Sequence, residues 1–203
     1  MLALDEADWA WIGAHFARRL KVHHTLKQYH RDGARLKFAE LAVGDSDPIA
    51  NCSASDFGLG PMILDLNRNA VDRIFELAGK MLALNTPAEL PQIVAQADLY
   101  SMKIGVGSEL ACMLRPSLCW VANTKSLWSY LFDYCDGNMR EAREMMHSYN
   151  EVGIATIYPH MEGSMVRVSE RQPDRGVSSL AGVRGYRYLW ADAICCRAFE
   201  RNF

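Results

Sequence analysis

Apolar residues are unevenly distributed along this chain, and their densest stretch runs from Ile104 to Cys135. This stretch carries only four charged residues and two of the five tryptophans. A segment that is apolar on nearly all sides is typical of an element buried between others, whereas a single apolar stripe marks a helix at the surface. We therefore expect Ile104 to Cys135 to form the core, with amphipathic helices packed around it.

The N-terminal segment predicts a long helix with an irregularity in its middle. Asp5 stands where a side chain can cap the first turn, and the acids after it favour the positive end of the helix dipole. Apolar residues follow helical spacing at Trp9, Ile12, Phe16 and Leu20. Further on they move to the opposite side of an ideal helix, at Val22, Leu26 and Tyr29. The pattern predicts either a bend near Lys21 or a helix that packs on two faces in turn.

The middle of the chain predicts further helices separated by turn signals. Helical spacing resumes over residues 34–43, and residues 44–60, rich in Gly, Ser, Asp and Asn, predict a loop. Proline at the first helical position starts a helix near Gly60-Pro61, which extends to Leu84 with an interruption near residues 67–69. Residues 86–89 read Thr-Pro-Ala-Glu, a capping-box pattern that begins the next helix.

The C-terminal part predicts a short helical hairpin, Thr124–Tyr134 with Met139–Tyr149, and a final helix from Tyr186 to Arg201. Residues 154–168 fit either a small β-hairpin or a helix that begins at Pro159, and the helix is favoured because the rest of the chain is helical. The predicted fold is mainly α, a single domain over residues 1–203 arranged as a bundle of about seven helices.

Composition limits the functional classes. Half of the residues are hydrophobic and 23% are charged, which is typical of a packed globule. The net charge of −2 gives no overall attraction to nucleic acid or to a membrane. The N-terminus has acids where a secretory signal has bases, and no apolar run approaches the roughly 20 residues that a membrane span needs. We expect a cytoplasmic protein with reduced cysteines and no membrane partner.

The clearest local charge feature is a basic segment over residues 15–37. It contains four histidines and a single acid, together with Arg18, Arg19, Lys21, Lys27, Arg31, Arg35 and Lys37. Such a segment can neutralise nucleic-acid phosphates or dock on an acidic protein surface. It can also be a solvated helix face balanced by residues 44–103, where acids outnumber bases eight to four.

The leading functional hypothesis is a non-catalytic interaction protein. It would bind a protein or nucleic-acid partner through the basic N-terminal helix, as an accessory or inhibitory protein of a mobile element would. No nucleophile motif and no close carboxylate pair is visible in the sequence, so a catalytic role is not favoured.

The alternative hypothesis is an enzyme that acts on a phosphorylated or nucleotide substrate. Gly105, Gly107 and Ser108 could place backbone amides around an anion at a helix start, with a histidine of the basic segment transferring a proton. The segment has neither the lysine of a P-loop nor a third glycine at dinucleotide spacing. A tight turn capped by Ser108 explains the same residues.

No metal and no cofactor is predicted. The histidines never stand four residues apart, and the cysteines form no CxxC pair, so the usual spacings of zinc ligands are missing. Cys195 and Cys196 are adjacent on the predicted last helix and are interpreted as core residues.

Overall fold

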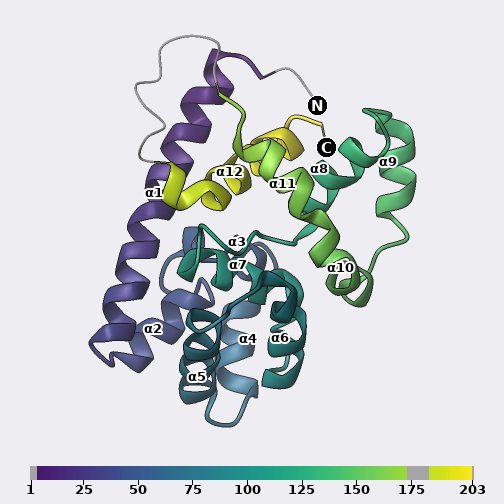
Figure 1. The fold of residues 1–203 in the computed structure, drawn as a ribbon. Helices are drawn as coiled ribbons and strands as arrows, with labels where there is room; N and C mark the ends of the chain where they lie inside the picture. Colours follow the sequence, from purple (N-terminus) through teal and green to yellow (C-terminus); the bar gives the residue numbers. More distant parts are fainter. Residues whose placement is uncertain (1–3, 173–182, 203) are drawn as a thin grey trace.

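The computed structural model describes residues 4–172 and 183–202, and within them the chain is helical and forms no strand (Figure 1). The predicted all-α class is confirmed. None of the described helices combines the length and the apolar character that a membrane crossing requires.

The α-helices are α1 Glu6–Arg31, α2 Arg35–Ala42, α3 Cys52–Ser55, α4 Leu59–Leu66, α5 Ala70–Leu82, α6 Leu90–Ala97, α7 Ile104–Leu114, α8 Thr124–Tyr134, α9 Met139–Met146, α10 Glu151–Ile157, α11 Glu162–Ser169 and α12 Arg187–Glu200. Short 3₁₀ helices connect several of them: η1 Pro48–Ala50, η2 Pro87–Glu89, η3 Tyr158–Met161 and η5 Arg184–Tyr186.

The described residues form more helices than the predicted number of about seven, and many of these helices are short. The expected loop over residues 44–60 contains η1 and α3. The helix expected from Gly60 to Leu84 is interrupted near residues 67–69 as predicted: α4 ends at Leu66, α5 begins at Ala70, and the φ of 54° at Asn69 lies in the left-handed region.

The β-hairpin considered for residues 154–168 is not formed. This segment folds as α10, η3 and α11, and it buries residues at helical spacing on one side, namely Ile154, Tyr158, Met161, Met165 and Val168. Burial of that stripe decided between two backbone forms that the local sequence left open.

Helix α1 runs without a break from Glu6 to Arg31, and it changes its packing partner along its length but uses one face, not two faces in turn. Its first half packs on α12, where the ring of Trp9 stacks on Trp190. Its last turn packs on α2 and α5, where His30 meets Phe38 and stacks on Phe75.

The buried face of α1 explains the irregularity in its apolar pattern. Buried positions recur every three or four residues along one stripe, but four of the buried residues are polar: Asp8, His15, Arg19 and His23. The apolar residues alone therefore mark only part of the buried stripe, so their pattern in the sequence wrongly suggests that the buried face of the helix changes side.

Helix α7 lies at the centre of the fold, and every residue from Ile104 to Leu114 is buried. Helices α1, α3, α5, α6, α10 and α12 all contact it. Trp120 and Trp128 are also buried. The prediction that the stretch from Ile104 to Cys135 forms the core is confirmed.

Candidate functional site

Arg19 is the centre of a buried charged cluster. Its side chain is fully buried, and its Nη1 atom is paired with a carboxylate oxygen of Glu109 on α7. Its Nη2 atom lies 3.0 Å from Oδ2 of Asp192 on α12. Nη1 also donates to the carbonyl of Ile49, at 2.9 Å. Because several kcal/mol are needed to take each ion out of water, such a cluster persists only with close partners.

Glu109 is held from its other side by the start of α3. Both carboxylate oxygens accept hydrogen bonds from backbone amides, of Cys52 and of Ser53, each at 2.8 Å. The Ser53 hydroxyl donates a further bond. Burial alone raises the pKa of Glu109, but the charge of Arg19 and these hydrogen bonds outweigh it and hold the pKa below its ordinary value. Glu109 is therefore an ionised carboxylate and a weak base.

Asp192 is in a less favourable environment. Burial raises its pKa to about 6, and the charge of Arg19 offsets this only in part. With both carboxylates ionised, the cluster of Arg19, Glu109 and Asp192 carries one more negative than positive charge. Asp192 is the member of the cluster that a proton or another cation would neutralise.

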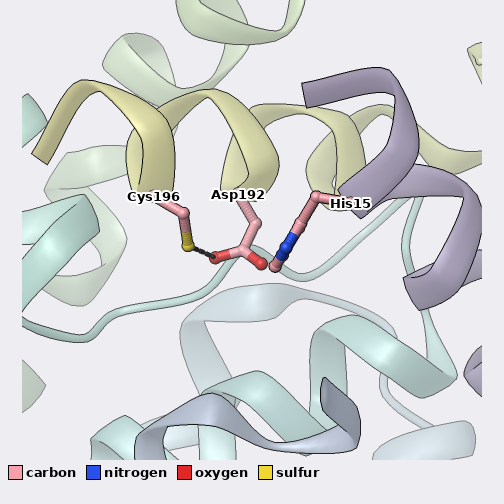
Figure 2. Close-up of side chains that lie close together, drawn as sticks. All are labelled: His15, Asp192 and Cys196. Atoms are coloured by element: carbon pink, nitrogen blue, oxygen red, sulfur yellow. Dashed lines mark hydrogen bonds between the residues drawn. The ribbon is translucent and has the colours of Figure 1, made fainter. Parts of the chain in front are cut away.

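His15 and Cys196 lie beside Asp192, as Figure 2 shows. Asp192 and Cys196 are on one face of α12, with 3.9 Å between Oδ1 and Sγ, and His15 approaches from α1. Burial, together with the charges of Arg19 and Arg18, lowers the pKa of His15 to about 3. Its ring is therefore neutral, and one ring nitrogen carries a free lone pair.

A cavity of about 550 Å³ opens beside this cluster, between the start of α3, the start of α7 and the start of α8. Ser53, Asn123 and Lys125 form part of its wall, and Phe57 and Tyr100 stand at its edge with exposed rings. This volume is in the range of small-molecule pockets, about 300–1,000 Å³.

Hydrogen bonds connect the cavity wall to the buried cluster. Asn123 donates from Nδ2 to the Ser53 hydroxyl at 3.1 Å, and that hydroxyl donates to Glu109. Glu109 in turn is paired with Arg19. The cluster thereby fixes the orientation of two polar side chains that face the cavity.

The charges of the cavity wall balance one another. Lys125 lies 3.1 Å from Asp56, and Lys103 and Glu151 add one charge of each sign to the lining. Burial alone would lower the pKa of Lys125, but neighbouring groups, Asp56 among them, raise it, so the ammonium stays charged. The wall is thus polar without a strong net charge.

The predicted anion-binding residues do not form an open turn. Gly105, Gly107 and Ser108 lie in the first turns of α7, and only Gly105 lines the cavity. Its amide donates to the Glu151 carboxylate at 3.3 Å, so a side chain of this chain already takes the anion position.

Gly107 and Ser108 have packing roles. A Cβ atom at Gly107 would stand 2.6 Å from a methyl group of Val94, so the glycine permits α6 to approach α7. Ser108 is fully buried, accepts a bond from the Ala122 amide and donates to the Gly105 carbonyl.

The predicted partner-binding residues divide into three groups. Arg19 is fully buried and must be removed from the set, because its guanidinium cannot reach a partner. Arg35 is exposed but pairs with Asp72 on α5 at 2.7 Å. The remaining five are exposed: Arg18, Lys21, Lys27, Arg31 and Lys37.

Sequence reasoning passed over Asp192 and Ser53, and it interpreted Cys196 only as a core residue. Asp192 and Cys196 are four residues apart on a helix, a spacing that places both side chains on one face. That spacing was a usable signal, although it matches none of the common zinc motifs. Ser53 had no comparable signal, because only the folded chain brings it to Glu109.

The chain matches no protein-family model, no curated protein and no solved structure at a significant level.

Proposed function

We propose that this protein binds a small molecule in the cavity beside the buried cluster. The observation that carries the proposal is the hydrogen-bond chain from Asn123 through Ser53 to the Glu109–Arg19 pair. Polar groups whose orientation is fixed before binding reduce the entropy cost of binding a ligand. The buried cluster fixes the side chains of Ser53 and Asn123 in the cavity wall in this way before a ligand binds.

The lining indicates the chemical class of the ligand. Exposed rings of Phe57 and Tyr100 at the edge favour a ligand with a flat or apolar body. Ser53 and Asn123 favour a polar group on that body. The balanced charges, and the Gly105 amide already bound to Glu151, disfavour a multiply charged phosphate. The ligand we propose is therefore aromatic or partly apolar, with a hydrogen-bonding end.

Binding without catalysis fits the same geometry. A serine beside a carboxylate suggests a nucleophile and a base, but a general base works best when its pKa is near the working pH. The pKa of Glu109 is lowered by Arg19 and by hydrogen bonds, so this carboxylate is poorly suited to take the Ser53 proton. The pair orients Ser53 and does not activate it.

The test is a thermal-shift screen of the purified protein with aromatic and heteroaromatic compounds, nucleosides, nucleotides and sugar phosphates. A ligand that binds the folded state raises Tm by mass action. We expect Phe57→Ala to weaken the response, since its exposed ring can be removed without a folding cost. Leu36→Ala, an exposed apolar residue on α2 away from the cavity, is the matched control.

Ser53 gives the second arm of this test. Ser53→Ala removes the hydroxyl that links Asn123 to Glu109, and we expect the affinity for a ligand found in the screen to fall. Ser55→Ala removes a hydroxyl on the same short helix that bonds only backbone carbonyls. Equal affinity in the two variants, or a screen without any responding compound, would count against the cavity as a binding site.

A second function is favoured by the exposed face of α1. Its bases Arg18, Lys21, Lys27 and Arg31 form no ion pair within the described residues, and no acid stands between Trp9 and Arg31. We propose that this basic face binds an anionic macromolecule, with nucleic acid as the class to be tested first. Phosphate contacts make such binding strongly dependent on salt.

Charge reversal on that face tests this second proposal. Lys21→Glu, Lys27→Glu and Arg31→Glu together should weaken binding of labelled duplex DNA or RNA in fluorescence anisotropy and flatten its salt dependence. Lys80→Glu, on the exposed side of α5, is the control. If the triple variant binds as the wild type does, nucleic-acid binding by this face is excluded, and binding only of an acidic protein would assign the face to a protein partner.

A further inference from the structure

Three buried side chains that neither proposed function uses meet between α1 and α12. They are His15, Asp192 and Cys196, and Figure 2 shows the Asp192 carboxylate between the Cys196 sulfur and the His15 ring. One possible ligand atom of each lies within 4.8 Å of the other two. In a tetrahedral zinc site, bonds of about 2.0–2.3 Å place neighbouring ligand atoms about 3.3–3.8 Å apart. Side-chain shifts of about 1 Å would close this group around an ion.

His15 supplies an independent observation. Its side chain is 4% exposed, and within the described residues its Nε2 atom has no hydrogen-bond partner. A buried polar nitrogen without a hydrogen-bond partner costs free energy, and binding of a metal ion by this nitrogen would remove that cost. The ring is held in place by Trp11, which stacks on it at 4.8 Å between ring centroids.

The buried charges supply the second argument. Arg19 contributes one positive charge, and Glu109 and Asp192 contribute two negative charges. A divalent cation that binds Cys196 as a thiolate releases the thiol proton to solvent and adds two positive charges and one negative. The sum of the cluster is then zero, which is the most favourable state for a group taken out of water.

We propose that His15, Asp192 and Cys196 bind one zinc ion, which joins the middle of α1 to α12. A donor set of imidazole, carboxylate and thiolate suits zinc, whereas magnesium and calcium prefer oxygen ligands alone. The three side chains leave one tetrahedral position for water. Arg19 pairs with Glu109 through Nη1 and with Oδ2 of Asp192 through Nη2, and the other carboxylate oxygen of Asp192, Oδ1, remains for the ion.

The first test uses the full chain, reduced and freed of metal with a chelator. Titration with Zn²⁺ should show one ion per chain and a raised Tm, and the same concentration of Mg²⁺ should leave Tm unchanged. Titration with Co²⁺ in place of zinc should produce a thiolate-to-cobalt charge-transfer band. Absence of stoichiometric binding, or a cobalt complex without that band, would overturn the proposal.

The second test identifies the ligands. Cys196→Ala and His15→Gln should each lose the one-ion stoichiometry, and Cys196→Ala should lose the charge-transfer band. Cys195→Ala is the matched control, since Cys195 is equally buried on the same helix but outside the cluster. Cys196→Ser, which preserves size, replaces the alanine variant if circular dichroism shows that the latter is unfolded. A band that persists without Cys196, or that disappears with Cys195, would place the thiolate elsewhere.

Discussion

Arg18 and Arg19 are neighbours in the chain and lie in opposite environments. Arg18 is exposed on α1, whereas the Arg19 guanidinium is buried between Glu109 and Asp192. A buried ion group adds little net stability compared with well-packed apolar residues, but removal of one partner leaves the others uncompensated. Without Arg19, the two buried carboxylates would lose the cation that pairs with both of them.

The contrast between these arginines is measurable. Arg19→Met should lower the free energy of unfolding by about 3–5 kcal/mol, because it strands two buried carboxylates. Arg18→Met should change it by less than about 0.5 kcal/mol, as is usual for an exposed position. Urea denaturation followed by circular dichroism measures both. Similar stabilities of the two variants would contradict the buried position of Arg19.

At the scale of elements, helix contacts depend on single small residues as well as on apolar stripes. Gly107 is a residue of α7, and because glycine has no side chain, Val94 of α6 can pack closely against it. Gly79 also lies inside a helix, α5, but a Cβ atom there would meet no atom within 4 Å. The same residue type is therefore required at one position and replaceable at the other.

These two glycines predict changes of opposite sign. Gly107→Ala should destabilise the protein by about 1–3 kcal/mol, because the added methyl group collides with Val94. Gly79→Ala should stabilise it by about 0.5–1 kcal/mol, because alanine favours the helix and fits without a clash. Thermal or urea unfolding provides the measurement. The double change Gly107→Ala with Val94→Ala should recover part of the loss, and no recovery would show that the collision lies elsewhere.

At the scale of the whole molecule, α1 contacts α12 near the C-terminal end of the chain as well as α2 and the central helix α7 (Figure 1). Near its start, Asp8 is buried and accepts a hydrogen bond from Arg197 of α12 at 2.9 Å. Near its end, His23 donates to the Met113 carbonyl of α7, and His30 packs on α2 and α5. Global stability therefore depends on the protonation of histidines along one helix.

This dependence predicts a loss of stability in mild acid. Burial lowers the pKa values of His23 and His30 below the ordinary value of 6.5, although the bond to Met113 opposes this at His23. The unfolded chain then binds these protons at a higher pH than the folded chain. The stability contributed by the neutral rings is fully present above pH 6.5 and is lost as the pH falls through 6.5 toward the folded pKa values.

His30→Phe isolates one of these contributions. The phenyl ring preserves the stacking on Phe75 but cannot bind a proton. At about pH 8 the variant should be as stable as the wild type, and between about pH 8 and about pH 5 it should lose less stability. Urea denaturation at both pH values decides the matter, and an unchanged pH dependence would show that His30 is not involved.

The sequence alone determined the features that depend on neighbouring residues. Asp5 caps α1 as its local pattern predicts, and the apolar stretch from Ile104 to Cys135 forms the core. Caps and helical spacing act within a few residues, so they can be read from the chain directly. The choice of helix over hairpin at 154–168 required burial against distant elements.

Only the tertiary structure separated the buried Arg19 from the exposed bases of the basic segment. In the sequence, Arg19 is one of seven bases spread over residues 15–37, and no neighbouring residue indicates that its environment differs from that of Arg18. Its partners Glu109 and Asp192 lie far along the chain, and their charges reach Arg19 only when α7 and α12 pack against α1. The strength of an ion pair depends on the distance between the two charges in space, and the residues next to Arg19 in the sequence do not indicate that distance.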